Sequence, residues 1–365
     1  MSEWQTFCLK DLGKIVGGAT PPTNNPKNYG NKIAWITPKD LSTLQGRYIK
    51  KGSRSISRLG FKSCSTFLLP KHAILFSSRA PIGYVAIAEK RLCTNQGFKS
   101  IIPNKKIYFE FLYYLLKYHK DNISNIGGGT TFKEVSGATL GLFQVKIPPT
   151  YYEQQKIART LSILDQKIEN NHKINELLHN LAHKVYEYYF KYKPKNAKLE
   201  QIIIENPKSS IMVKNAQKTQ DKYPFFTSGD NTLSYPKAII DGRNCFLNTG
   251  GNAGIKFYVG KASYSTDTWC ICANEFSDYL YLLLSSIKTH INQSFFQGTS
   301  LKHLQKNLLK KYPIYMPSAH EIKKFNQIIM PLLTLISINT RTSKKLEQIR
   351  DFLLPLLLKQ QVKPQ

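Results

Sequence analysis

The sequence has 365 residues, of which 41% are hydrophobic and 12% aromatic, so general disorder is excluded and two or three domains are expected. Its 52 lysines and arginines against 23 acidic residues give a formal charge of +29, which favours a nucleic acid or an anionic membrane as the partner. No apolar stretch reaches the roughly 18 residues that span a bilayer, and no signal peptide is recognisable at the start. Six scattered cysteines predict a reduced, cytoplasmic protein.

Charge and predicted secondary structure divide the chain into four segments. Residues 1–150 carry 22 basic and 7 acidic side chains, and residues 193–317 carry 16 and 8. Both segments consist of short predicted strands punctuated by Gly, Pro and Asn, and each has a predicted helix before its end, over 107–120 and 276–290. A long helical segment follows each of them, over residues 151–192 and 318–365.

The first basic segment contains a region without any negative charge. Residues 41–88 hold eight basic side chains and no acidic one. A solvated surface normally mixes both signs, so this region favours contact with a polyanion over an ordinary solubilising surface. Lysine and arginine contacts to phosphate position a protein on DNA. The predicted phosphate contacts are Arg47, Lys50, Lys51, Arg54 and Arg58.

Candidate base-reading residues lie in turns of both basic segments. Arg79 precedes a Pro-Ile-Gly turn, where it either reads guanine through two hydrogen bonds or pairs with a carboxylate of the same domain. Asn95 either reads adenine or caps a turn, and Lys99 follows it closely. In the second basic segment, a glycine-rich stretch allows close approach to a ligand but equally suits a hairpin turn. Its candidates are Asn248, Thr249, Asn252 and Lys256.

The two halves of the chain resemble each other. The stretch GTTFK from Gly129 aligns with GTSLK from Gly298 at an offset of 169 residues. One deletion later the helical segments align as well, with Glu153 facing Glu321. This pattern predicts one unit of about 170 residues that is used twice.

Each long helical segment carries a seam with alternating steps of four and three residues, typical of a coiled coil. Asn171 and Asn339 occupy the same step of the two seams, which favours pairing of the helices with each other over separate packing of each helix on its neighbouring domain. Pro331 and Pro355 predict a kink or a late start in the second helix. The predicted helix-pairing residues are Ile157, Leu161, Leu164, Ile168, Asn171, Leu178, Ile329, Leu332, Ile336, Asn339, Leu346 and Leu353.

These passages resemble the specificity subunits of Type I restriction-modification systems. The resemblance covers essentially the whole chain and rests on WITPKDL, SSRAPIG, TNQGF, GGTTFKEVS, the run LGLFQVKIPPTYYEQQKIARTLSILDQKI, and the counterparts GTSLKHL and YPIYMP. Its most specific part is the run from Pro148 to Leu161. The second half departs from it, because the equivalent stretch keeps Glu321 but lacks the glutamine that follows.

The resemblance implies an α+β fold in which two β-rich target-recognition domains alternate with two long helices that pair as an antiparallel coiled coil. Residues 1–150 would form the first recognition domain, 151–192 the first spacer helix, 193–317 the second recognition domain and 318–365 the second spacer helix. Each domain would read one half of an asymmetric, split target in double-stranded DNA. Two modification subunits and the restriction subunits would assemble on the chain.

The resemblance also implies that this chain is not an enzyme and binds no cofactor or metal. S-adenosylmethionine, ATP and Mg²⁺ are expected on the partner subunits. Other hypotheses remain: a stand-alone DNA methyltransferase or nuclease with an unrecognised site, a subunit of a Type II-like or modification-only complex, and an RNA-binding scaffold. A membrane-surface scaffold is disfavoured and no membrane partner is expected, because the basic segments are strand-rich and no basic amphipathic helix dominates. Cys270 and Cys272 lie two apart on a predicted strand, and without a second pair they favour a core role over a zinc site.

Overall fold

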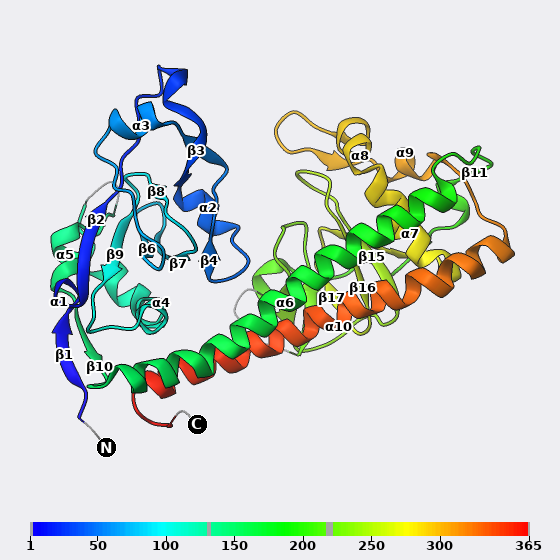
Figure 1. Ribbon diagram of the computed structural model, residues 1–365. Coiled ribbons are helices and arrows are strands. Elements are labelled where there is room, and N and C mark those ends of the chain that lie inside the picture. The colour runs from blue at the N-terminus through cyan, green and yellow to red at the C-terminus, as the bar shows by residue number, and fades with distance from the viewer. Residues whose placement is uncertain (1–2, 130–132, 217–221, 364–365) are drawn as a thin grey trace. The chain divides into compact units, whose positions relative to one another are not determined.

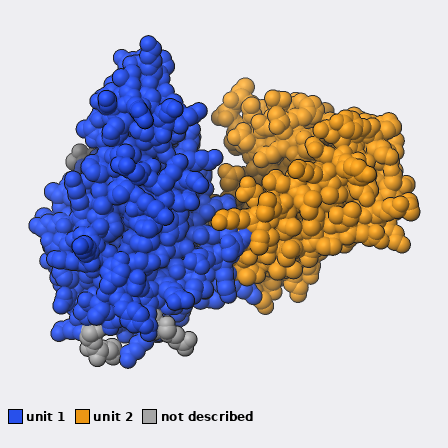
Figure 2. Space-filling view, viewed as in Figure 1, with its two compact units in different colours: residues 1–170, 345–365 blue, residues 171–344 orange. Residues whose placement is uncertain are grey.

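The computed structural model describes residues 3–129, 133–216 and 222–363 (Figure 1). The chain forms two compact units, coloured separately in Figure 2. Unit 1 comprises residues 1–170 and 345–365, and unit 2 comprises residues 171–344. Residues 130–132 of the repeated GTTFK stretch lie outside the described residues. Within the described ranges, no helix is long and apolar enough to cross a membrane.

The described residues of unit 1 form three sheets. The largest has the strand order β2-β9-β6-β7-β4, the second β5-β3-β8, and β1 pairs with β10. The strands are β1 (Gln5–Cys8), β2 (Gly13–Gly17), β3 (Tyr29–Ile36), β4 (Tyr48–Ile49), β5 (Arg54–Ile56), β6 (Ile74–Ser78), β7 (Ile82–Ala88), β8 (Cys93–Thr94), β9 (Lys99–Pro103) and β10 (Gln144–Ile147). The helices are α1 (Leu9–Leu12), α2 (Pro38–Ser42), α3 (Arg58–Lys62), α4 (Phe109–Asn125) and α5 (Gly137–Leu142).

Helix α4 forms the centre of the core of unit 1. Six consecutive residues, from Phe111 to Leu116, are buried, because the helix packs on β7 and against the first turns of the long helix that follows. A stretch that is apolar on all sides, as these six residues are, is typical of such an enclosed position. The helix predicted over 107–120 is therefore present, although it extends to Asn125.

Unit 2 has sheets of the same design. Its four-stranded sheet has the order β12-β18-β15-β16, a second has β14-β13-β17, and β11 pairs with β21 and β19 with β20. The strands are β11 (Ala197–Lys198), β12 (Ile204–Glu205), β13 (Tyr223–Phe226), β14 (Leu233–Tyr235), β15 (Arg243–Asn248), β16 (Ile255–Val259), β17 (Ser263–Tyr264), β18 (Thr268–Cys272), β19 (Phe296–Gln297), β20 (His303–Leu304) and β21 (Pro313–Ile314). The helices are α7 (Ser277–Ser286), α8 (Lys288–Ser294) and α9 (Lys306–Lys310), so the helix predicted over 276–290 is divided at Ile287.

The strand orders of the two units correspond in chain order and direction. All neighbours in β2-β9-β6-β7 and in β12-β18-β15-β16 are antiparallel. In the three-stranded sheets, β3 and β13 each have one antiparallel and one parallel neighbour, in the same positions. Unit 1 has the additional strand β4 at the edge of its largest sheet.

Two long helices complete the fold: α6 (Tyr151–Phe190) and α10 (Ala319–Leu358), each of 40 residues. Both begin with the same local device, a hydroxyl residue followed three positions later by glutamate. Thr150 Oγ1 accepts a hydrogen bond from Glu153 N at 3.2 Å, and Ser318 Oγ accepts one from Glu321 N at 3.3 Å. Because this cap begins α10 at Ala319, the expectation of a late start was wrong: Pro331 and Pro355 lie inside the helix.

Side chains of α6 and α10 hydrogen-bond to each other within unit 2. Asn171 Nδ2 donates to Ser343 Oγ at 3.2 Å, and Asn339 Nδ2 donates to Asn175 Oδ1 at 2.9 Å. Residues later in α6 therefore contact residues earlier in α10, as antiparallel neighbours do. Ile157, Leu161, Ile168, Ile329 and Ile336 are buried, whereas Leu164, Leu178, Leu332, Leu346 and Leu353 are half-buried.

Candidate nucleic-acid interface

Four predicted phosphate contacts lie on consecutive elements of unit 1. Lys50 and Lys51 follow β4, Arg54 begins β5 and Arg58 begins α3, and all four side chains are exposed. The Arg54 guanidinium lies over the ring of Tyr29, 4.4 Å from its centroid. An exposed run of cations without an intervening acid attracts phosphates. We name Lys50, Lys51, Arg54 and Arg58 the cationic strip.

The carboxylate of Asp40 binds the backbone of the loop that carries the cationic strip. Asp40 accepts hydrogen bonds at 2.7 Å from the backbone N–H groups of Ser53, inside the strip, and Thr37, at the start of α2. Partial burial acts to raise the pKa of Asp40, but these hydrogen bonds outweigh it and lower the pKa. The WITPKDL stretch therefore holds the loop that carries the cations.

The prediction that Arg47 contacts DNA phosphate was wrong for this structure. Its side chain is 3% exposed and forms ion pairs with Glu110 at 2.9 Å and with Glu169 at 3.1 Å. Both carboxylates are distant in sequence, so the local pattern of positive charge did not indicate them. Arg47 is consequently unavailable to a nucleic acid without breaking these pairs.

Arg79 and Lys99 converge on one carboxylate. Glu134 accepts Arg79 Nη1 at 3.4 Å and Lys99 Nζ at 3.2 Å, and the Arg79 and Glu134 side chains are 36% and 35% exposed. The alternative of an ion pair within the domain is therefore present, although the Arg79 side chain stays accessible from the surface. Asn95 Oδ1 accepts from Gly97 N at 3.0 Å, which is the turn-capping alternative for that residue.

The glycine-rich stretch of unit 2 is held by Lys256. Lys256 is half-buried, and its Nζ donates to the backbone oxygens of Thr227 and Gly229 and, at 3.4 Å, to Asn248 Oδ1. Burial lowers the pKa of Lys256. Asn248 is itself buried and donates to Asn252 O at 3.1 Å. The prediction that the buried Asn248 contacts DNA was therefore wrong, whereas the half-buried Lys256 holds the loop together and its contact with DNA stays a prediction.

Thr249 and Asn252 remain at the surface of this loop. Thr249 is half-buried and donates to Asp267 O at 2.8 Å, and Asn252 is exposed. The sequence did not indicate that the repeated GTSLKH stretch lies beside them. Gly251 N donates to Lys302 O at 2.9 Å, which brings the exposed side chains of Lys302 and His303 to the loop.

The same contact occurs in both units. Val135 N donates to Ser78 O at 3.0 Å in unit 1, and Leu304 N donates to Thr249 O at 3.0 Å in unit 2. Ser78 is followed by Arg79, whereas Thr249 is followed by Gly250. The alignment of GTTFK with GTSLK indicated that the two stretches are equivalent, but not which strand ends they contact. Equivalent backbone positions thus present different side chains.

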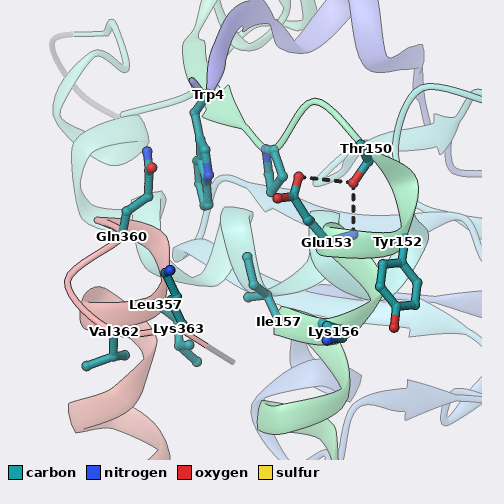
Figure 3. A pocket seen from close by; sticks show the side chains of 11 residues that line it. Trp4, Thr150, Tyr152, Glu153, Lys156, Ile157, Leu357, Gln360, Val362 and Lys363 are labelled. Atoms are coloured by element: carbon teal, nitrogen blue, oxygen red, sulfur yellow. Dashed lines mark hydrogen bonds between the residues drawn. The ribbon is translucent and has the colours of Figure 1, made fainter. Parts of the chain in front are cut away.

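A cavity of about 540 Å³ lies in unit 1 beside the first turns of α6 (Figure 3). Trp4, Ile157 and Leu357 give it an apolar lining. Glu153 also lines it, but its carboxylate is engaged with Thr150 Oγ1 at 3.0 Å in the helix cap. Within the described parts of the chain, no group of three or more His, Cys, Asp or Glu residues could hold a metal ion.

A family model described as "Type I restriction modification DNA specificity domain" matches residues 1–180 and 195–348. The chain is 32% identical to the Type I restriction enzyme MjaIX specificity subunit of Methanocaldococcus jannaschii, over 98% of this chain and 93% of that protein. It is 30% identical to the Type I restriction enzyme HindI specificity subunit of Haemophilus influenzae, over 46% of this chain and 37% of that protein.

One solved structure is similar over nearly the whole length. The crystal structure of the Type-I restriction-modification system S subunit from M. genitalium superposes with a TM-score of 0.64 at 18% identity. The match covers 98% of this chain and 96% of that one. At this level of identity the likeness concerns the fold.

Proposed function

The chain belongs to the family of Type I restriction-modification DNA specificity subunits, and we propose that it reads a bipartite, asymmetric target in double-stranded DNA. Each β-rich domain reads one half of the target, and the modification and restriction subunits assemble on the chain. The observation that carries this proposal is the occurrence of one strand order twice, with different side chains at equivalent loop positions. We name residues 1–150 recognition domain 1 and residues 193–317 recognition domain 2.

In recognition domain 1 the cationic strip binds the phosphate backbone, and Arg79 reads a base edge. Phosphate contacts supply affinity that does not depend on sequence, whereas a bidentate arginine discriminates guanine. Glu134 presents Arg79 at the surface until DNA competes for the guanidinium. In recognition domain 2 the equivalent position is Gly250, so the reading contacts come from its neighbours Thr249, Asn252, Lys302 and His303.

The two units are copies of one ancestral design, joined by an antiparallel coiled coil of α6 and α10. The hydrogen bonds of Asn171 with Ser343 and of Asn175 with Asn339 support this pairing. The matching caps at Thr150 and Ser318 support the repeat. A buried polar pair in such a seam fixes register at some cost in stability.

Partner subunits bind the outer faces of the same two helices. Large apolar side chains are exposed there, and exposed apolar surface marks sites of protein association. They are Ile163, Ile174, Leu177 and Leu181 on α6, and Leu335, Ile338, Ile349 and Phe352 on α10. S-adenosylmethionine, ATP and Mg²⁺ belong to those partners, this chain contributes recognition without catalysis, and the assembled complex acts in the cytoplasm.

Methylation mapping tests the proposal. A host that expresses the chain with its modification subunit should carry methylation at two short defined blocks separated by a fixed undefined gap. Deleting the chain alone should abolish that motif while the modification subunit remains expressed. Exchanging recognition domain 2 for that of a relative should change one block and leave the other intact. Methylation that persists without the chain would contradict the proposal, as would S-adenosylmethionine binding and methyl transfer by the purified chain alone.

A further inference from the structure

Each recognition domain is attached to the long helices by an arginine with little exposure. Arg47, in the loop before β4, reaches the acidic face of α6 in unit 1. Arg243, the first residue of β15, reaches α10 in unit 2. Both guanidinium groups are engaged by side chains of their own unit, so neither belongs to the surface proposed to contact DNA.

The unit 1 attachment consists of ion pairs among charged side chains that have little exposure. Glu169 Oε1 on α6 accepts both the backbone N–H of Arg47 at 2.9 Å and its Nε at 3.1 Å. Arg47 Nη1 donates to Glu110 Oε1 on α4 at 2.9 Å, while Asp165 on α6 accepts Arg350 Nη1 of α10 at 2.6 Å. The side chains of Arg47 and Asp165 are only 3% and 5% exposed. Arg47 Nε also lies 3.9 Å from Asp165 Oδ2, so one loop of recognition domain 1 is attached to α6 at the residue that binds α10.

The unit 2 attachment uses one face of α10. Arg243 pairs with the buried Asp278 of α7 and donates from Nη1 to Thr334 Oγ1 at 2.9 Å. One helical turn further, Ser337 Oγ accepts the backbone N–H of Val259 at 3.0 Å. Arg341 Nη1 then donates to Val259 O at 2.9 Å. Positions 334, 337 and 341 share a helix face, so successive turns of α10 contact the domain.

Such contacts restrict orientation more strongly than apolar packing does. The hydrophobic effect is non-directional, so apolar faces can be repacked at modest cost. Hydrogen bonds from a planar guanidinium require fixed directions, and a shifted domain would leave buried charges unpaired. Another orientation of either domain on its helix is therefore strongly disfavoured.

We infer that Arg47 with Glu169, and Arg243 with Asp278 and Thr334, are positioning residues that set the gap between half-sites accepted by the protein. The inference rests on the proposed function, since only a bipartite reader has a gap. One inserted base pair moves a half-site by about 3.4 Å and rotates it by about 34°. A recognition domain that is held in one orientation on its helix cannot follow the displaced half-site, whereas a domain with a weakened attachment can.

The test measures methylation of duplexes that differ only in gap length. The complex of the full-length chain with its modification subunit is given the correct gap and gaps one base pair shorter and longer. Joint engagement of two linked readers contributes a factor of about 10² to 10⁴, which sets the expected preference of the unaltered complex. Glu169→Ala should lower that preference about tenfold or more without changing either half-site sequence, and Arg243→Lys, which loses the bidentate geometry, should act likewise.

Gln166→Ala is the matched control, since Gln166 is an exposed residue of the same helix. It should keep the full preference. If Glu169→Ala prevents assembly, Glu169→Gln replaces it, because its amide oxygen still accepts the Arg47 backbone N–H. An unchanged preference in the assembled Glu169 and Arg243 variants would overturn the inference, as would an equal loss of methylation at every gap length. If the unaltered complex has no gap requirement, the proposed function itself fails.

Discussion

Asn339 on α10 donates a hydrogen bond from Nδ2 to Oδ1 of Asn175 on α6, at 2.9 Å. Asn175 Nδ2 in turn donates to Thr340 Oγ1 at 3.3 Å and to Ile336 O at 3.4 Å, two acceptors that lie on α10. The two amides therefore satisfy each other's hydrogen-bonding groups between the helices, one turn away from the hydrogen bond of Asn171 with Ser343. An axial shift of one helix by a turn would separate both amides from their partners, so the pair favours a single register.

Substitution of this pair should show that the stability contributions of the two amides are coupled. Asn175→Leu alone should lower the free energy of unfolding by about 1–2 kcal/mol, because Asn339 loses its acceptor. The double variant Asn175→Leu with Asn339→Leu should recover that loss, since both polar groups are then removed. Urea unfolding of the four proteins in a double-mutant cycle measures the coupling. Asn180→Leu, at an exposed position of α6, is the control and should be nearly neutral; additive losses would contradict the pairing.

The cationic strip should contribute affinity without specificity. Alanine at Lys50, Lys51 and Arg58 together should weaken binding to every duplex by a similar factor. The slope of log K against log salt should fall by about 1 for each cation that no longer neutralises a phosphate, because fewer counterions are released. Fluorescence anisotropy at several salt concentrations measures both quantities. Lys105→Ala, which removes an exposed lysine outside the strip, should leave the slope unchanged; an unchanged slope in the triple variant would remove the strip from the interface.

Arg79 should act in one half-site only. Arg79→Ala should cost about 1–3 kcal/mol at one base pair of the first block and relax the preference there, while the second block stays defined. Methylation motif mapping of the variant supplies the readout. Arg91→Ala, at another exposed arginine of the same domain, should keep the complete motif. A uniform loss of affinity without a change in motif would instead make Arg79 a phosphate contact.

Acid sensitivity at the start of α10 should depend on Glu321. The backbone N–H of Ser318 at 3.0 Å and the Tyr315 hydroxyl at 2.8 Å lower the pKa of Glu321 to about 2. A folded-state pKa below the unfolded value stabilises the fold above the unfolded pKa, and this contribution is lost as pH falls through the folded pKa. The stability difference between the unaltered chain and Glu321→Gln should therefore be full above about pH 5 and vanish toward pH 2.

Thermal unfolding at a series of pH values measures that difference. Glu200→Gln, in the same unit, is a suitable comparison because Glu200 is an exposed acid outside the helix cap. It should show little dependence over the same range. A Glu321→Gln difference that is constant from pH 7 to pH 2 would show that the carboxylate charge has no part in the cap.

Local patterns in the sequence were enough to predict the long helices, and the resemblance of its motifs was enough to indicate the family. Heptad spacing can be recognised without the fold, because a helix repeats one backbone geometry along its whole length. The prediction of short strands in the two basic segments likewise rested on local residue patterns. Strand order could not be predicted, since pairing such as that of β3 with β8 joins residues nearly sixty positions apart and depends on the packed core.

Which cations are available became apparent only from the folded chain. Arg47 and Arg58 look alike in a run of positive charges, yet Arg47 is buried against carboxylates from α4 and α6 whereas Arg58 is exposed. Lys256 likewise binds loop carbonyls that follow β13. The charge of a side chain is written in the sequence, but its availability depends on partners that folding brings together from distant segments.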